Sequence, residues 1–296
     1  MEMGYLSPLI AQLTETESIN LVKSIKHQEI ITPLSPKAIV TSYVQQGNTG
    51  TPILLLHGFD SSVVEFRRLL LLLATQNQTW AVDLLGFGFT DRPKEIEISP
   101  SAIAIHLYSF WKTLINQPVI LVGASMGGAA AIDFTLTYPE AVKKLVLIDS
   151  AGFRAGSARG KFMFSPLVGY LATQFLRNPK VRASISRTAY KDRSLASLDA
   201  QLCAALHLNM PSWDRALISF TKSGGYTSFK DKLAHLQLAT LILWGNADRI
   251  LGIADADKFK SAISHSQLIW INDCGHVPHL EQPQLTAQHI LDFLSD

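Results

Sequence analysis

The fold is decided by the stretch Val119-Ile120-Leu121-Val122-Gly123-Ala124-Ser125-Met126-Gly127-Gly128. Its first four residues predict a buried strand, and residues 127–138 predict a helix that ends before Pro139. The pattern G-x-S-x-G lies between the two. In this context it is typical of a nucleophile elbow, a sharp turn that projects the serine hydroxyl above the sheet edge. The glycines are needed because the neighbouring backbone leaves no room for a Cβ. Ser125 is therefore the candidate nucleophile.

Strands and helices alternate on both sides of this turn. Short apolar or β-branched runs predict strands at residues 38–44, 52–57, 80–84, 119–122, 145–148, 239–244 and 267–271. Helical patterns lie between most of these runs. Continuous apolar strands that alternate with helices predict an α/β fold, in which a parallel sheet is covered on both faces.

Two local signals add detail to this pattern. Gly47-Asn48-Thr49-Gly50 separates the first two predicted strands and predicts a hairpin between them. Ser62-Val63-Val64-Glu65 is a capping box, which predicts a helix from residue 62 to about residue 75.

The alternation stops over residues 151–235, where the pattern indicates several helices and no clear strand. We therefore expect residues 1–150 and 236–296 to form one α/β core and residues 151–235 to form a helical cap. The cap carries 13 Lys and Arg against 4 Asp and no Glu, whereas acidic residues outnumber basic ones in the rest of the chain. This excess fits either a solvated helical surface or a basic lid that meets an anionic substrate, a lipid surface or an acidic partner.

The composition limits the class of protein. With 296 residues, 47% of them hydrophobic, the chain is expected to be a soluble globular protein that needs no disulfide bonds. It has only two cysteines, Cys203 and Cys274, and no visible signal peptide, which favours a cytoplasmic location. The net charge of +2 gives no reason to expect a nucleic-acid partner.

A serine hydroxyl needs a base before it can act as a nucleophile. His276 is the candidate base because it directly follows Gly275, just past the last predicted strand. His279 is its nearest competitor, but it lies further toward the final helix.

The base needs a carboxylate that orients it. Asp248 is the candidate, since it follows the predicted strand 239–244 in a loop from which a carboxylate can reach the histidine. Asp149, at the end of the preceding strand, is the alternative. Asp83 ends another strand, but it precedes the serine and is expected to hold loop structure.

An acyl-transfer site also needs two donors for the oxyanion. The backbone N–H of Met126, directly after the nucleophile, is one candidate. The second is the N–H of Phe59, in the segment Leu56-His57-Gly58-Phe59-Asp60 that follows an early strand.

Together these segments resemble the α/β-hydrolase superfamily, in its capped branch of esterases, meta-cleavage-product hydrolases and relatives. The matching segments are 57–59, 83–88, 123–128, 244–248, and Gly275-His276 with Glu281 and Pro283. The order serine, acid, histidine is also that of the superfamily. The resemblance implies a parallel-rich eight-stranded sheet, with the cap after the sixth strand.

The resemblance favours a serine hydrolase that cleaves a carboxylic ester or similar activated carbonyl of a largely apolar small molecule through an acyl-enzyme. Haloalkane dehalogenases and epoxide hydrolases of this branch carry Asp where Ser125 stands, which argues against both. A C–C bond hydrolase of the meta-cleavage-product type and a catalytically silent binding protein remain as alternatives. No cofactor and no metal are expected, although Cys274, His276 and His279 lie close in sequence.

The cap contains a charge-free segment over residues 162–176, followed at once by a basic stretch. Fifteen residues are too few for a helix that spans a bilayer, so the segment predicts an apolar pocket wall or a weak interfacial contact without stable membrane insertion. The sequence carries no signal for an oligomeric state.

Overall fold

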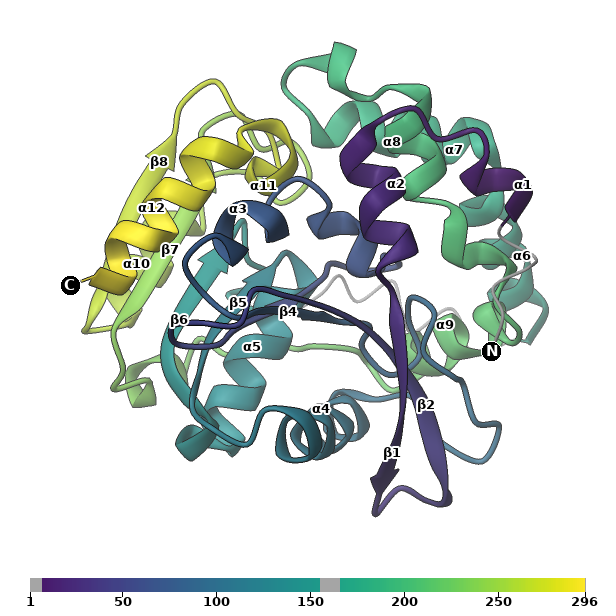
Figure 1. Cartoon of the computed structure of the whole chain (residues 1–296), viewed down its shortest axis with the longest axis horizontal. Helices are drawn as coiled ribbons and strands as arrows, with labels where there is room; N and C mark the ends of the chain where they lie inside the picture. The colour runs from purple at the N-terminus through teal and green to yellow at the C-terminus, as the bar shows by residue number, and fades with distance from the viewer. Residues whose placement is uncertain (1–6, 155–165, 296) are drawn as a thin grey trace.

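Strand β5 (Val119–Ala124) lies inside an eight-stranded sheet, hydrogen-bonded to β3 on one side and β6 on the other. The computed structural model describes residues 7–154 and 166–295 (Figure 1). Every residue of β5 is buried. Its side chains alternate between two apolar clusters, one on each face of the sheet. The run of apolar residues in β5 therefore reflects burial on both faces.

The order of the strands across the sheet is β1-β2-β4-β3-β5-β6-β7-β8. The pairs β1–β2 and β2–β4 are antiparallel, and all the other pairs are parallel. The strands other than β5 are β1 (Lys26–Thr32), β2 (Ser35–Gln46), β3 (Ile53–Leu56), β4 (Thr79–Val82), β6 (Val142–Ile148), β7 (Thr240–Gly245) and β8 (Ser266–Ile271). The predicted α/β fold with a mostly parallel eight-stranded sheet is confirmed.

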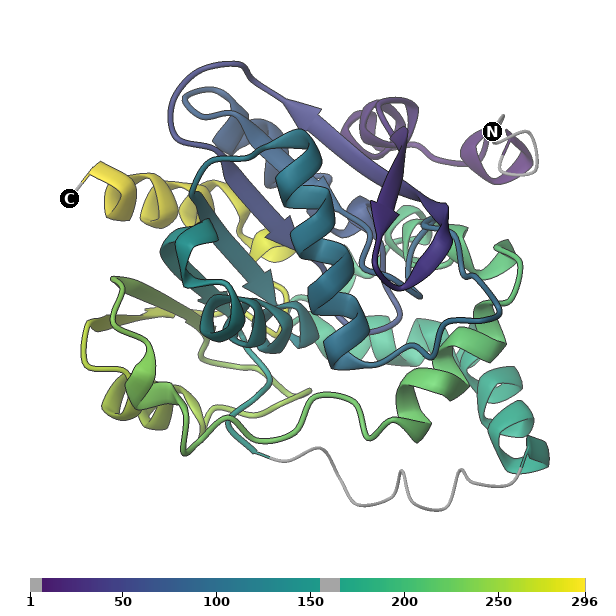
Figure 2. The same ribbon diagram turned by 90° about the horizontal axis from the view of Figure 1, so that it is seen from below.

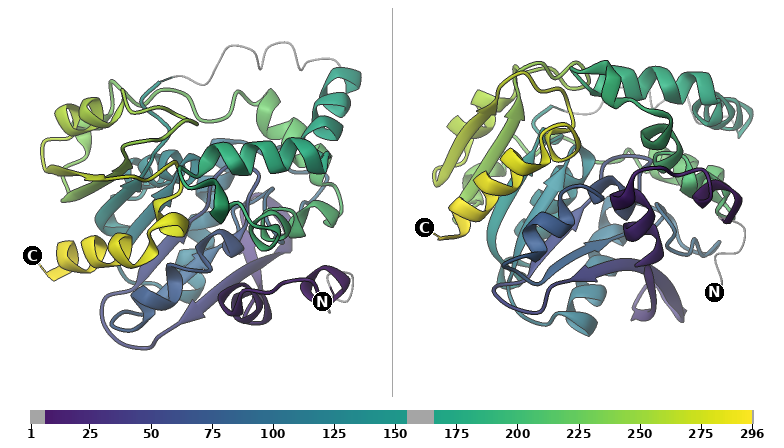
Figure 3. Two further views of the ribbon diagram at one scale, coloured as in Figure 1. Left: turned by 90° about the horizontal axis from the view of Figure 1, so that it is seen from above. Right: turned by 45° about the horizontal axis from the view of Figure 1, so that its top comes forward.

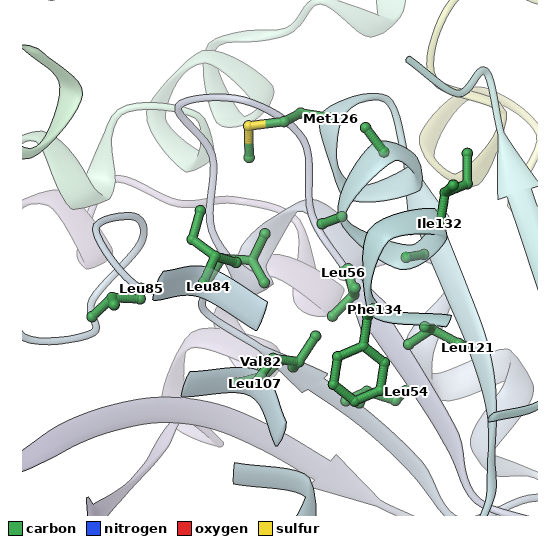
Figure 4. Close-up of a cluster of buried hydrophobic side chains, with 14 of the residues drawn as sticks. Leu54, Leu56, Val82, Leu84, Leu85, Leu107, Leu121, Met126, Ile132 and Phe134 are labelled. Atoms are coloured by element: carbon green, nitrogen blue, oxygen red, sulfur yellow. The ribbon is translucent and has the colours of Figure 1, made fainter. Parts of the chain in front are cut away.

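Helices cover both faces of this sheet. Those of the core are α2 (Thr16–Lys23), α3 (Leu70–Ala74), α4 (Pro100–Leu114), α5 (Met126–Thr137), α10 (Ala256–Ala262), α11 (Pro278–Glu281) and α12 (Pro283–Ser295), with the short α1 (Ser7–Ile10) before them. Buried side chains of α4, α5 and α10 belong to one apolar cluster, and those of α2, α3 and α12 to the other. Figure 2 shows α4 and α5 lying across the first face. Figure 4 shows part of that cluster, in which Leu54, Leu121 and Phe134 meet.

The predicted hairpin is wrong. Strand β2 pairs with β1 and β4, while β3 runs parallel to β4 and β5, so β4 separates the two strands that the hairpin would join. The turn itself exists, because Gly47 and Gly50 have φ of 71° and 69°. It carries the chain past the position that β4 later occupies. Local turn chemistry indicated the turn, but the pairing depends on a strand more than twenty residues further along the chain.

The predicted helix over residues 62–75 is interrupted. A short 3-10 helix (Val63–Phe66) comes first, and α3 follows after a break. The Ser62 hydroxyl accepts a hydrogen bond from the backbone N–H of Val64 at 3.4 Å. Glu65 does not complete the capping box, because its carboxylate binds elsewhere, as described below.

Within the described residues, four α-helices lie between β6 and β7: α6 (Pro166–Arg177), α7 (Pro179–Ala189), α8 (Leu198–Cys203) and α9 (Trp213–Lys222). In its described part, residues 151–154 and 166–235, this region contains no strand. Figure 3 shows its helices in green along one side of the sheet. The boundaries of the cap at residues 151 and 235 stay a prediction, and residues 162–165 of the charge-free segment lie outside the described residues. None of the described helices combines the length and apolar character that crossing a bilayer requires.

Candidate active site

Ser125 stands on a strained turn between β5 and α5. Its φ of 53° and ψ of −119° are unusual for a residue with a side chain. Three backbone hydrogen bonds of 3.0 Å hold it: its N–H donates to the carbonyl of Ile148, and its carbonyl accepts from Gly128 and Ala151. The strain is therefore held by the end of β6 and by the first turn of α5.

The glycines around Ser125 allow a close approach of three backbone segments. A Cβ on Gly123 would lie 2.2 Å from the carbonyl oxygen of Gly127, and one on Gly127 would lie 2.0 Å from that of Leu56. Backbone atoms at such distances cannot be moved aside cheaply. The prediction that no Cβ fits here is confirmed, and the turn brings Ser125 next to the end of β3.

His276 and Asp248 meet at the carboxyl ends of β7 and β8. Nδ1 of His276 lies 2.9 Å from Oδ2 of Asp248. The other oxygen, Oδ1, accepts hydrogen bonds from the backbone N–H groups of Ile250 at 2.7 Å and Leu251 at 3.1 Å. Burial opposes ionisation of Asp248, but the hydrogen bond and charge of His276, with these two N–H groups, lower its pKa. The carboxylate is thus charged at neutral pH and favours a proton on Nδ1 of His276.

One cavity of about 300 Å³ connects these residues. Ser125 and His276 both line it, together with Gly58 and Phe59 of the loop after β3 and several side chains of α7. A Cβ on Gly58 would lie 3.4 Å from the Cβ of Ser125. The cavity therefore brings the candidate nucleophile, the candidate base and the loop of the second oxyanion donor to one space. Met126, the other candidate donor, is the first residue of α5.

The loop after β3 is held by buried polar groups that the sequence analysis did not identify. Nε2 of His57 accepts a hydrogen bond from the N–H of Leu84 at 3.1 Å. Its Nδ1 must then carry the proton and donate to the carbonyl of Gly58 at 2.8 Å. Burial lowers the pKa of His57 to about 4, which keeps the ring neutral at pH 7. His57 thus anchors the loop as a neutral donor and acceptor.

Glu65 anchors the same loop from the other side. Its Oε2 accepts a hydrogen bond from the N–H of Gly58 at 3.0 Å, and its Oε1 lies 3.2 Å from Nε2 of His279. Burial opposes ionisation, but the hydrogen bond and charge of His279, with smaller contributions from His57 and Ser61, lower the pKa of Glu65 to about 2. His279, the competitor for the base, is therefore occupied by Glu65.

Asp60 connects this loop to the helices between β6 and β7. Its carboxylate forms an ion pair with Arg182 of α7 and lies 3.0 Å from Nε2 of His207. It also accepts a hydrogen bond from Nε1 of Trp213, in α9, at 2.7 Å. Burial opposes ionisation, but His207, Arg182 and Trp213 lower the pKa of Asp60. One core carboxylate therefore holds three segments of the predicted cap.

Asp149 and Asp83, the other two aspartates considered, lie in different environments. Asp149 accepts a hydrogen bond from the N–H of Gly245 at 3.1 Å. Burial, and then the charge of Asp248, raises its pKa well above the usual value. Asp83 accepts hydrogen bonds of 2.7 Å from the N–H groups of Val63 and Phe89, so the expected loop-holding role is confirmed.

Asp149, Asp248 and His276 are also the group that comes nearest to a metal site among the described residues. Their ligand atoms lie within 4.8 Å of one another. The raised pKa of Asp149 favours its protonated form, which is a poor metal ligand. This group is better suited to hold a proton than a cation.

Comparison with known proteins shows the family of this chain. The family model described as "alpha/beta hydrolase fold" matches residues 51–283. The chain therefore belongs to the alpha/beta hydrolase family, and it is a hydrolase of that type.

Individual relatives differ in their named activities. The chain is 36% identical to the alpha/beta hydrolase domain-containing protein VTE7 of Arabidopsis thaliana, over 83% of this chain and 74% of that protein. It is 28% identical to 2-hydroxy-6-oxo-2,4-heptadienoate hydrolase of Pseudomonas putida, over 83% and 90%. The solved structure of a thermophilic esterase from Thermogutta terrifontis matches with a TM-score of 0.77 at 22% identity, over 91% and 98%, which shows the shared fold.

The role of Glu65 predicts a pH-dependent loss of stability. Its pKa is about 2 in the folded chain, against an ordinary 4.5. A carboxylate with a lowered pKa stabilises the folded state above its unfolded pKa and loses this contribution as the pH falls through its folded pKa. Glu65→Gln is expected to lower the free energy of unfolding by about 3 kcal/mol at pH 7. The difference from wild type should shrink as the pH falls from 4.5 toward 2.

Urea unfolding at several pH values measures this difference. Glu97→Gln, at an exposed position, is the matched control and should leave the free energy of unfolding unchanged within about 0.5 kcal/mol. A deficit of Glu65→Gln that stays constant over the whole pH range would contradict the assignment.

Proposed function

We propose that the chain is a serine hydrolase that cleaves a carboxylic ester or a similar activated carbonyl of a largely apolar small molecule. The observation that carries this proposal is the cavity shared by Ser125 and His276, together with the hydrogen bond of His276 to Asp248. A hydroxyl, an imidazole and a buried carboxylate in this arrangement suit nucleophilic attack on a carbonyl carbon.

The proposed reaction follows from the protonation states. Asp248 binds the N–H at Nδ1 of His276, which leaves Nε2 unprotonated. Nε2 takes the proton of the Ser125 hydroxyl as the oxygen attacks the carbonyl, and it returns this proton to the leaving alcohol. Water then attacks the acyl-enzyme by the same route in reverse. The backbone N–H groups of Phe59 and Met126 are the proposed donors to the oxyanion.

A C–C bond hydrolase of the meta-cleavage-product type is the second candidate. The relative from Pseudomonas putida supports it, because its name describes a hydrolase of an oxo-dienoate. The segment Phe59-Asp60-Ser61-Ser62 argues against it, since such enzymes usually carry a longer segment rich in glycine and proline after His-Gly. Turnover of an oxo-dienoate together with inactivity on a panel of 4-nitrophenyl esters would favour this candidate.

Replacement of the nucleophile tests the mechanism. Ser125→Ala should lower ester turnover by at least about a thousandfold, because nucleophile and base act as a unit. It should also abolish labelling by an organophosphonate probe, while circular dichroism stays unchanged. Near-normal turnover in a folded Ser125→Ala protein would rule out the serine mechanism. Absence of labelling in wild type would favour the silent binding protein.

Two aspartate variants distinguish the acid from its neighbour. Asp248→Asn should lower turnover on the order of ten-thousandfold, because His276 loses the carboxylate that orients it. Asp149→Asn is the matched change and should cost far less, since Asp149 binds the N–H of Gly245 and burial raises its pKa, which favours the uncharged form. Steady-state kinetics on one ester measures both. The reverse order of effects would make Asp149 the acid.

We also propose a weak interfacial contact through α6. Leu171 and Phe175 expose 58% and 62% of their surface there, and Arg177 follows in the same helix. Apolar side chains beside a cation suit a loose contact with anionic lipid. Leu171→Ser with Phe175→Ser should weaken binding to anionic vesicles in co-sedimentation by at least about a hundredfold, since burial of each side chain contributes roughly 2 kcal/mol. Ile31→Ser, at an exposed position of β1, is the control. Vesicle binding that is absent or insensitive to salt would contradict the proposal.

A further inference from the structure

Arg67 is a buried cation at the cavity that Ser125 and His276 line. Only 2% of its surface is exposed, and it contributes to the cavity wall. Among the described residues, no hydrogen-bond partner reaches its Nε or its Nη2. Leaving buried donors of a charged group without acceptors is costly, so this guanidinium calls for an explanation.

Neighbouring carboxylates do not supply the missing acceptors. Arg68 takes both oxygens of Glu15, with Nε at 3.1 Å and Nη2 at 2.7 Å. Nε of Arg67 is 3.8 Å from the nearer of these oxygens, which is too far for a hydrogen bond. Two guanidinium groups therefore share one carboxylate, and Arg68 has the better geometry. Burial raises the pKa of the Tyr190 hydroxyl, which also contacts Arg67, so this neighbour is uncharged at neutral pH.

The other charged groups at the cavity are already paired. Arg182 binds Asp60, and Glu65 binds the N–H of Gly58 and lies against His279. In the described part of the chain, Arg182 also lacks a partner at Nε, but its Nη2 binds Asp60, whereas Arg67 lacks a hydrogen bond at both Nε and Nη2. His279 lines the same cavity, and its Nδ1 also has no hydrogen-bond partner among the described residues.

The chemistry of the unpaired edge identifies the missing partner. The N–H groups at Nε and Nη2 lie side by side and nearly parallel, and they match the two oxygens of a carboxylate. We propose that Arg67 binds a carboxylate group of the substrate, so that the enzyme acts on esters that also carry a free carboxylate. Ala200, Cys203 and Leu280 line the same cavity and suit an apolar body between the two ends. This inference rests on the proposed ester hydrolysis only in that it calls the bound molecule a substrate. Binding of a carboxylate to Arg67 can be measured without turnover.

A pair of ligands that differ only at the second carboxyl tests the proposal. Monomethyl suberate carries one free carboxylate, and dimethyl suberate carries none. Calorimetry with the Ser125→Ala protein measures binding of each without hydrolysis. We expect the monomethyl ester to bind at least about tenfold more tightly, and Arg67→Met to remove this preference. Arg187→Met removes a charge from an exposed position of α7 and should leave the preference unchanged.

Two further variants cover the outcome in which Arg67→Met does not fold. Arg67→Lys keeps the charge but loses the paired N–H groups, so it should weaken the preference several-fold. Glu15→Gln removes the competing carboxylate and should strengthen the preference for the monomethyl ester. In the active enzyme, the Arg67 variants should raise KM for the monomethyl ester at least about tenfold more than KM for the dimethyl ester.

The outcomes separate this inference from the proposed function. Equal affinity of the two esters for a folded Ser125→Ala protein would overturn the carboxylate site, as would a preference that survives in Arg67→Met or, where that variant does not fold, in Arg67→Lys. Selective binding of the monomethyl ester without hydrolysis of any ester by wild type would leave the carboxylate site standing and overturn the proposed function.

Discussion

The close packing of backbone around Ser125 is the constraint on which the rest of the structure depends. Gly123, Gly127 and the end of β3 approach one another so closely that no Cβ fits between them. This contact forces the chain through the strained conformation of Ser125 and places its side chain above the carboxyl edge of the sheet. In a parallel sheet the loops after β6, β7 and β8 meet at the same edge, and these loops supply Asp149, Asp248 and His276. The geometry of one turn thereby selects which parts of the chain can form a site.

How far the sequence predicts this molecule depends on whether a signal is local. β5 and α5 are predictable because β5 is apolar throughout, α5 is apolar over most of its length, and glycines mark the turn between them. The sequence pattern does not predict β1, because β1 is an edge strand that pairs with β2 alone in the sheet. Polar residues fill most of this strand, and of its two isoleucines Ile30 is fully buried while Ile31 is 83% exposed. The hairpin prediction is wrong for a related reason, because it rests on a local turn signal alone. A turn can be recognised from four residues, but the order of strands in the sheet depends on β4, which local patterns do not include.

In the candidate site, too, local signals can be predicted from the sequence and long-range contacts cannot. The spacing and order of Ser125, Asp248 and His276 are visible in the sequence, whereas the residues that support the loop after β3 are not. Glu65 fits a capping box, and only the fold shows that its carboxylate contacts Gly58 and His279 instead. Arg67 is likewise one of two adjacent arginines. Arg68 pairs with Glu15 at 2.7 and 3.1 Å while Arg67 stays 3.8 Å away, and no sequence pattern contains such a difference.

The basic excess of residues 151–235 and the acidic excess of the rest of the chain also have a structural role, because they form ion pairs with each other. Arg182 pairs with Asp60, Arg154 with Asp255, and Lys191 with Asp273, so three cations between β6 and β7 meet carboxylates outside that segment. Arg215 adds hydrogen bonds to the backbone carbonyls of residues 92–94. These four basic residues therefore hold the segment between β6 and β7 against the rest of the chain, so this part of the basic excess needs no external anion. The buried Asp60 cluster is screened least by salt and contributes most to this docking, whereas the exposed Lys191 pair contributes little. Because Asp60 lies in the loop that carries Phe59, the contact that holds the helices between β6 and β7 also positions one wall of the cavity.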